Sequence, residues 1–261
     1  FNGGGIQCET SSPTIANCII SDNMTVIGGG VYCSDRSSPH LINCIIRGNT
    51  AEIGGGIYSD SSSPRITNCT ISGNSSTMSG GGIYSDSSST TVINSILWGD
   101  TEQENMREIN LDNESSISIT YSDIQQNTGI YPGAGNINDD PLFIDSDNGD
   151  YHLEPDSPCI DTGTNDHAPD YDMDGEERPF DGDGDGEAIC DMGSYEYGST
   201  TPDADLDGDG DIDGSDLAIF SSTFGSVSGD TNYNEDADFD EDESIDDDDL
   251  AIFAENFGQE G

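Results

Sequence analysis

The chain has 261 residues with 54 acidic and 5 basic side chains, no lysine, and a formal net charge of −49 at pH 7. A chain with this charge is not expected to bind nucleic acid phosphates or anionic membranes, because like charges repel, and it attracts cations instead. No apolar run approaches the ~20 residues that a membrane-spanning helix needs.

The length allows one elongated domain and a second small one. Seven cysteines fit an oxidising compartment. No signal peptide is visible and the chain opens on Phe1, inside a repeat, so we expect a processed or truncated form. A solvated acidic surface of the kind found in salt-adapted proteins has a similar composition, so acidity alone does not prove metal binding.

A Gly-Gly-Gly motif recurs through the first 100 residues with a period of 25 or 26 residues. Its copies occupy residues 3–5, 28–30, 54–56 and 80–82. A fixed period of this size is typical of a solenoid. Within each repeat the apolar residues alternate over short stretches, which favours strands over helices.

Aligning the repeats predicts three columns of inward-facing side chains, one from each wall of the solenoid. The columns are Ile6, Val31, Ile57 and Ile83; Ile15, Leu41, Ile66 and Val92; and Ile20, Ile46, Ile71 and Leu97. Asparagines recur at one turn, and we expect each amide to bond to the next coil, about 4.8 Å away. They are Asn17, Asn43, Asn68 and Asn94.

Further motifs continue the pattern beyond the clear repeats. They are Asn94–Trp98, Tyr121–Ile124, Gly135–Phe143, Gly149–Leu153, Ser157–Asp161 and Asp191–Tyr197. With these motifs, residues 1–197 resemble right-handed parallel β-helix proteins of the pectin-lyase-like class, and the last motifs resemble the closing coils of a large secreted bacterial family. The resemblance implies an all-β solenoid with an extracellular or cell-surface location, and little about chemistry.

Cysteines at equivalent places on adjacent coils lie about one strand spacing apart, within disulfide range. This spacing predicts the pairs Cys8–Cys33 and Cys18–Cys44. A third pair, Cys159–Cys190, would clip the closing segment, which leaves Cys69 over. The alternative is a column of buried free thiols, because unpaired cysteines are among the most buried residues.

Alternating Asp and Gly before Cys190 provide closely spaced carboxylates in a flexible segment, as in calcium loops. The candidate ligands of this third acidic cluster are Asp172, Asp174, Asp181, Asp183 and Asp185. The alternative is a solvated acidic loop, in which Arg178 pairs with one of the carboxylates.

Catalysis is the less favoured reading, although the β-helix class hosts polysaccharide lyases and glycosidases. A calcium-assisted lyase needs a Lys or Arg base beside the metal, and no acidic cluster accompanies the arginines of the repeats, Arg36, Arg47 and Arg65. A glycosidase needs two positioned carboxylates, whereas Asp35, Asp60 and Asp86 lie in corner sequences typical of solvated turns. The histidines His40, His152 and His167 form no motif.

A stripe of aromatic side chains offers a binding function. Tyr32, Tyr58 and Tyr84 recur on successive coils and point away from the inner isoleucine column. An exposed stripe of this kind suits a glycan, whereas its plain interpretation is packing on a sheet surface.

The last 60 residues contain the same acidic loop twice, each followed by Asp-Leu-Ala-Ile-Phe. Carboxylates fall at loop positions 1, 3, 5, 9 and 12, and position 7 contributes a backbone carbonyl, the oxygen set that Ca²⁺ prefers. The first loop has Asp205, Asp207, Asp209, Asp211 (position 7), Asp213 and Asp216; the second has Asp238, Asp240, Asp242, Ser244 (position 7), Asp246 and Asp249. A disordered acidic tail is the alternative, but it gives no reason for the repeat.

An amphipathic helix is expected after each loop, because apolar residues recur at i, i+3 and i+7. The two sets are Leu217, Phe220 and Phe224, and Leu250, Phe253 and Phe257. Residues 203–260 resemble a type I dockerin, which implies two Ca²⁺ ions and a cohesin partner. Glu243 departs from that pattern by replacing the glycine of position 6, and positions 10 and 11 depart from the usual cohesin-contacting pair.

We therefore predict an all-β solenoid over residues 1–197, a linker over 198–202 and a small α-helical calcium module over 203–261. The predicted function is that of a secreted, calcium-binding structural or adhesive protein. Its uncapped first coil suggests head-to-tail assembly into a filament or surface layer. The alternatives are a cohesin-binding or glycan-binding module and, less favoured, a polysaccharide-active enzyme.

Overall fold

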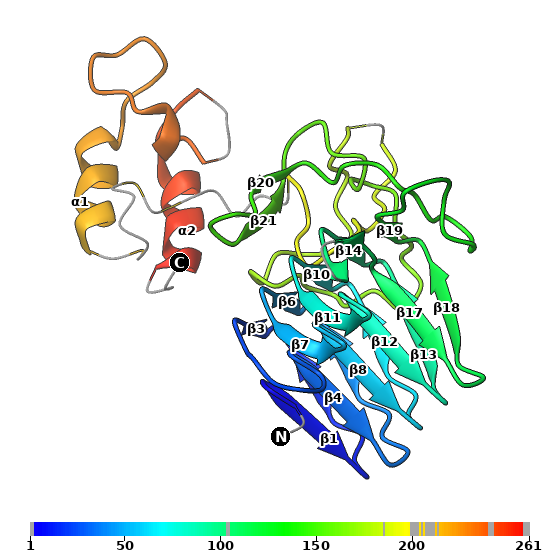
Figure 1. Ribbon diagram of the computed structural model, residues 1–261. Helices are drawn as coiled ribbons and strands as arrows, with labels where there is room; N and C mark the ends of the chain where they lie inside the picture. Colours follow the sequence, from blue (N-terminus) through cyan, green and yellow to red (C-terminus); the bar gives the residue numbers. More distant parts are fainter. Residues whose placement is uncertain are drawn as a thin grey trace. The chain divides into compact units, whose positions relative to one another are not determined.

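The computed structural model describes residues 3–102, 105–184, 186–198, 204, 206, 212, 214–239 and 243–257. The chain divides into two compact units, Phe1–Ser199 and Thr200–Gly261 (Figure 1). This division falls within the predicted linker, residues 198–202, of which only residue 198 is described.

Short strands stacked in four sheets build the first unit as a solenoid (Figure 1). One sheet contains β1 (Ile6–Glu9), β4 (Val31–Ser34), β8 (Ile57–Asp60), β12 (Ile83–Asp86) and β17 (Ile109–Asp112). The next contains β2 (Thr14–Ala16), β5 (His40–Ile42), β9 (Arg65–Thr67), β13 (Ser89–Ile93) and β18 (Ser116–Thr120). A third contains β3 (Ile19–Ser21), β6 (Ile45–Arg47), β10 (Thr70–Ser72), β14 (Ile96–Trp98) and β19 (Asp123–Ile124). The fourth contains β7 (Thr50–Ile53), β11 (Ser75–Ser79), β15 (Thr101–Glu102) and β16 (Asn105–Met106).

The strands pair in parallel within these sheets, except that β15 and β16 are antiparallel. The registers confirm all three predicted columns. Each column gains one further member, Ile109, Ile119 or Ile124. These side chains form the core of the solenoid, and each fully buried one stabilises the fold by about 1.5–3 kcal/mol.

Backbone packing explains the Gly-Gly-Gly motif. The first glycine of each copy has a positive φ, +66° at Gly28, a conformation that costs other residues about 1–2 kcal/mol. A Cβ on the second glycine would collide with the next coil, since at Gly29 it would lie 2.2 Å from the Gly55 carbonyl oxygen. The motif therefore marks the corner where successive coils approach most closely.

The predicted asparagine ladder is only partly formed. Asn43 donates to Asn17 Oδ1 at 3.3 Å, and Asn94 donates to Asn68 Oδ1 at 3.4 Å. The amides of Asn43, Asn68 and Asn94 also donate to backbone carbonyls of the closing segment, which we define as residues 139–198. This column therefore serves mainly to attach the closing segment to the coils.

A continuous side-chain ladder occurs at a turn that was not predicted. It runs from Asn23 through Asn49 and Asn74 to Asp100, with amide–oxygen distances of 2.8–2.9 Å. Its middle members Asn49 and Asn74 are fully buried, and these repeated hydrogen bonds connect four successive coils.

The two ends of the solenoid differ. The strands of the first coil, β1, β2 and β3, are sheet edges, and Met24 beside them is 81% exposed. At the other end, the chain after β19 turns back over the last coil. There Asn136 Nδ2 donates to the Ile119 carbonyl at 3.0 Å, and Tyr131 packs on the core.

The closing segment is mostly irregular. It includes one antiparallel hairpin, β20 (Phe143–Asp145) and β21 (Asp150–Leu153). Its apolar residues Leu153, Cys159, Ile160 and Met192 pack with Ile96 into a second small core.

The C-terminal unit contains α1 (Gly214–Thr223), the 3-10 helix η1 (Glu235–Ala237) and α2 (Asp247–Asn256). The rings of Phe220, Phe239 and Phe253 stack in its core, 5.3–6.3 Å apart. Of the six apolar residues predicted to share the buried helix faces, only Phe220 and Phe253 are buried. Leu217, Phe224, Leu250 and Phe257 are exposed, because Phe239, Ala204, Ala237 and Ile245 complete the small core. Among the described residues, no helix is long and apolar enough to cross a membrane.

Candidate metal sites

The second acidic loop of the C-terminal unit begins and ends with buried carboxylates. Asp238 at position 1 is 7% exposed, and its Oδ1 is buried with no hydrogen-bond partner among the described residues. Its Oδ2 accepts the Glu243 N–H at 3.1 Å and the Tyr233 hydroxyl. A buried, unpaired carboxylate oxygen is costly unless a cation or donor meets it.

Asp249 at position 12 is fully buried. Its oxygens accept the N–H groups of Phe239 and Asp246 at 2.6 and 2.8 Å, so it ties together the two ends of the loop. Asp246 is exposed and Ser244 is half-buried. The remaining predicted ligands of this loop, Asp240 and Asp242, lie outside the described residues.

In the first loop, only the last predicted ligand is described. Asp216, in the first turn of α1, is fully buried, as is its counterpart Asp249 in the first turn of α2. The other predicted ligands, Asp205, Asp207, Asp209, Asp211 and Asp213, lie outside the described residues. The two copies of the loop therefore place their position-12 aspartate equivalently, buried in the first turn of a helix.

Glu243 has the backbone conformation that its position predicts. Its φ is +72°, in the left-handed region where glycine is favoured. The neighbouring backbone is fixed by pairing, since Ser228 donates to the Glu243 carbonyl at 2.8 Å and Ile245 donates to the Ser226 carbonyl at 2.9 Å. The turn therefore forms with backbone strain at one residue, Glu243.

In the first unit, the structure brings together Asp161, Asp181 and Asp183, with one ligand atom from each within 4.8 Å of the others. Asp161 accepts the Asp183 and Ile189 N–H groups at 2.7 and 3.2 Å, which fixes its orientation. The sequence indicated Asp181 and Asp183 but not Asp161, which lies 20 residues earlier in a different motif. Asp185 lies outside the described residues.

The other two predicted ligands of this cluster lie elsewhere. Asp172 is buried and accepts three backbone N–H groups, from Asp174, Glu176 and Glu196, at 2.8–2.9 Å. Asp174 contacts His152 Nε2 at 2.7 Å, while Asp150 contacts Nδ1 at 2.6 Å. Both aspartates thus organise the closing segment.

Arg178 lies inside the closing segment, and among the described residues its ion pair is with Glu196 instead of with a predicted ligand of the third acidic cluster. Its Nε lies 2.7 Å from Glu196 Oε2, and both side chains are fully buried. The guanidinium also donates to Asn43 Oδ1 at 3.3 Å. Burial raises the pKa of neighbouring Asp191 to about 8, and the negative charge of Glu196 adds to the rise.

All seven cysteines lie among the described residues and all are free thiols in the structure, so none of the three predicted disulfides is formed in it. Cys8 and Cys33 hold paired positions. Cys159 and Cys190 have different partners, since Cys159 Sγ lies 3.6 Å from Asp123 and Cys190 Sγ accepts from Asn68 at 3.2 Å. Alkylation without reductant, followed by mass spectrometry, tests the pairing.

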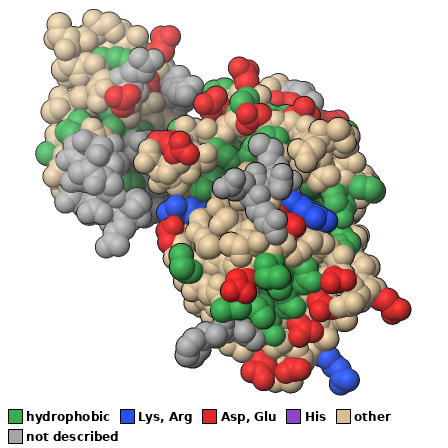
Figure 2. Space-filling view, in the orientation of Figure 1, with side chains coloured by type: hydrophobic (Ala, Val, Ile, Leu, Met, Phe, Trp, Pro, Cys, Tyr) green, Lys and Arg blue, Asp and Glu red, His purple; other side chains and the backbone are tan. Residues whose placement is uncertain are grey.

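The tyrosine stripe is a stacked column with little exposed ring surface at its ends. Ring centroids of Tyr32, Tyr58 and Tyr84 lie 5.4 and 5.0 Å apart, and Tyr32 and Tyr84 are buried. Hydrophobic side chains gather near β4 and β8 on the face shown in Figure 2, with acidic side chains around them. This geometry fits packing on the sheet surface better than an open aromatic platform.

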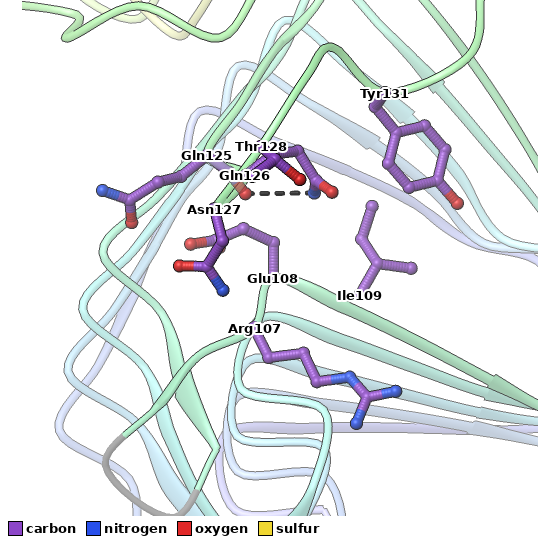
Figure 3. A pocket seen from close by; sticks show the side chains of 8 residues that line it. All are labelled: Arg107, Glu108, Ile109, Gln125, Gln126, Asn127, Thr128 and Tyr131. Atoms are coloured by element: carbon purple, nitrogen blue, oxygen red, sulfur yellow. Dashed lines mark hydrogen bonds between the residues drawn. The ribbon is translucent and has the colours of Figure 1, made fainter.

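A pocket of about 260 Å³ lies beside the last coils, where the sequence indicated no site (Figure 3). Its lining combines one arginine, one buried glutamate, several amides and a tyrosine. The residues are Arg107, Glu108, Ile109, Gln125, Gln126, Asn127, Thr128 and Tyr131. Arg107 pairs with Glu102 at 3.4 Å, whereas Glu108 is turned inward and is 1% exposed.

Comparison with known proteins agrees with the observed fold. A family model described as "Right handed beta helix region" matches residues 4–149, more than half of the chain. No curated protein and no solved structure matches the chain. The parallel sheets, the stacked apolar columns and this match together assign the chain to the family of right-handed parallel β-helix proteins.

Proposed function

We propose that this β-helix protein is a calcium-binding structural or adhesive protein of the extracellular space or cell surface. The observation that carries the proposal is the pair of buried carboxylates Asp238 and Asp249 at the ends of the second loop. Among the described residues, Asp238 Oδ1 is buried and has no hydrogen-bond partner. Oxygen-only ligands in a short loop suit a hard divalent cation.

Calcium would act in this proposal as a folding cofactor. In the second loop, Asp238 and Asp249 would hold it together with Asp240, Asp242, Asp246 and the Ser244 carbonyl, and the first loop would use the equivalent residues. In the solenoid unit, Asp161, Asp181 and Asp183 would hold a further ion. At free calcium 100 times its dissociation constant, each site adds about 2.7 kcal/mol of stability.

Calorimetric titration of the full chain with CaCl₂ tests the proposal. We expect saturable binding, lost at one site in Asp249→Asn and at another in the double variant Asp181→Asn, Asp183→Asn. Asp236→Asn is the matched control, because Asp236 is exposed and its substitution removes the same charge. Absence of saturable binding at millimolar calcium, or equal losses in the control, would contradict the proposal.

Self-association through the first coil is a second candidate function, favoured by the exposed edge strands and by Met24. Unpaired strand edges accept further strands. Head-to-tail stacking by strand pairing alone is disfavoured, because residues 125–139 turn back over the opposite end. A coil from another chain, or from another part of the polypeptide, would instead cover the edge.

Electron microscopy in millimolar calcium and again in chelator tests assembly. Particles of defined stoichiometry that dissociate in Met24→Asp would support it, and single short rods under both conditions would contradict it. The alternative functions are binding to a cohesin and binding to a glycan. A pull-down with a cohesin tests the first, and an oligosaccharide array tests the second. We propose no catalytic function.

A further inference from the structure

The ladder that runs along the solenoid from Asn23 follows one hydrogen-bonding rule at every step. The backbone N–H and the side-chain Nδ2–H of each asparagine both donate to the side-chain Oδ1 of the next coil. From Asn23 to Asn49 the distances are 3.0 and 2.9 Å, and from Asn49 to Asn74 they are 3.0 and 2.9 Å. From Asn74 to Asp100 they are 2.6 and 2.8 Å.

Glu108 occupies the position beyond Asp100 where the ladder residue of a further coil would lie. The Asp100 N–H donates to Glu108 Oε1 at 3.1 Å, as each earlier backbone N–H donates to the following Oδ1. By the same rule, a side-chain donor on Asp100 should face Glu108. Asp100, however, has a carboxyl oxygen where the asparagines have an N–H.

The third glycine of each Gly-Gly-Gly motif independently shows that Asp100 Oδ2 occupies the amide nitrogen's place. A Cβ on Gly5, Gly30 or Gly56 would lie 2.9–3.2 Å from the Nδ2 of the ladder asparagine beside it. A Cβ on Gly82 would lie 2.5 Å from Asp100 Oδ2. The four coils are thus equivalent, with an oxygen substituted for a nitrogen in the last.

The two carboxyl groups are deeply buried and lie at the same step of the ladder, where the Asp100 N–H binds Glu108 Oε1. Asp100 is 0% and Glu108 1% exposed, and each carboxyl raises or lowers the pKa of the other, as neighbouring groups do. Asp100 Oδ2 and Glu108 Oε2 are both buried and have no hydrogen-bond partner among the described residues. Two ionised carboxylates at the same step repel each other, and burial adds a large desolvation cost.

We propose that Asp100 and Glu108 share one proton, so that a carboxyl O–H replaces the amide N–H and extends the ladder by one step onto Glu108. The pair thereby closes the ladder and makes the last coils sensitive to pH. The proton belongs to the pair, which titrates as a unit. Burial raises the pKa of both carboxyls, and the charge of Asp100 adds to the rise at Glu108.

Among the described residues, no positively charged group shifts the pKa of either carboxyl. Asn74 donates to Asp100 from the preceding coil, and Gly82 lies beside Asp100 in the same coil. Burial raises the pKa of Tyr151 in β21 and the charge of Asp100 adds to the rise, whereas the charge of Arg47 acts on Tyr151 in the opposite direction. Arg107, adjacent in sequence, directs its guanidinium to Glu102, and Figure 3 shows it extending away from the Glu108 side chain.

The proposal predicts the sign of a pH effect. Carboxyls whose folded pKa is raised stabilise the fold below their ordinary pKa, near 4, and this stability is lost as the pH rises toward the raised value. In that window the folded protein holds one more proton than the unfolded chain. The unfolding equilibrium constant should therefore rise by about tenfold per pH unit from this pair.

Denaturant unfolding of the full chain in saturating calcium at pH 5, 6 and 7 tests the proposal. Asp100→Asn supplies a permanent N–H, so relative to wild type it should gain about a hundredfold in folding equilibrium between pH 5 and 7. Glu108→Gln should flatten the pH dependence in the same way. Exposed Asp35→Asn, with the same charge change, should follow the wild-type curve. Wild-type and Asp100→Asn curves that run parallel would overturn the proposal.

Infrared spectroscopy gives a direct readout that does not depend on stability. The wild-type minus Asp100→Asn difference spectrum at pH 7 should contain the C=O stretching band of a protonated carboxyl. A difference spectrum with only carboxylate bands would show two ionised groups and would also overturn the proposal.

Discussion

At position 243 the second acidic loop carries a glutamate in a backbone conformation that suits glycine, with φ at +72°. Replacing it by glycine should stabilise the C-terminal unit by about 1 kcal/mol, because the strain of the left-handed conformation disappears. Thermal unfolding of the full chain in calcium measures the gain. Glu243→Ala removes the same charge and keeps a Cβ, so it should give little of the gain; equal effects of both variants would contradict the role of strain.

His152 should make the stability of the closing segment depend on pH. Burial lowers its pKa, but hydrogen bonds to Asp174 and Asp150 outweigh burial and raise it to about 9. A raised folded pKa means that the contribution to stability is present below pH 6.5 and is lost as the pH rises through 9. Because the side chain is 42% exposed, solvent screening limits the effect to about 1 kcal/mol.

Unfolding of wild type and His152→Gln between pH 6 and 10 checks this expectation. The difference in unfolding free energy should shrink toward alkaline pH. A constant difference over the range would mean that the histidine contributes by stacking on Tyr195 and not by its charge.

At the scale of elements, the closing segment is held on the coils by buried polar groups. Arg178 and Glu196 are both fully buried, so Arg178→Met should leave Glu196 without its counter-charge and cost about 3–5 kcal/mol. The double variant Arg178→Met, Glu196→Gln should recover much of that loss. Chemical denaturation measures both, and additive losses would mean that the two side chains are not coupled.

The strands of the solenoid were predictable from sequence because the alternation of apolar and polar residues in a strand is visible over a few consecutive residues. The period of the Gly-Gly-Gly motif and the alternation of Ile, Val and Leu specified the three columns, and the register of the strands confirms them. The disulfide pairs stay predictions, since equal spacing along a column fits thiols and disulfides alike.

Contacts between distant segments were not predictable. Arg178 contacts Asn43, 135 residues away, and nothing in either motif indicates the other. Asp161 was missed as a neighbour of Asp181 because it belongs to an irregular turn. The true ladder was missed because its last members, Asp100 and Glu108, break the asparagine pattern, although they keep its hydrogen bonds.

At the scale of the whole molecule, a net charge of −49 opposes compact folding through self-repulsion. The solenoid unit offsets this with long apolar columns, whereas the C-terminal unit has one small aromatic core. We therefore expect the second unit to depend on bound calcium far more than the first.

Circular dichroism of the full chain in millimolar calcium and in excess chelator tests this account most directly. We predict that chelation removes the helical signal of α1 and α2 while the β signal of the solenoid persists, and that restored calcium reverses the loss. Spectra that are identical in calcium and in chelator would contradict the claim that calcium holds the C-terminal unit together.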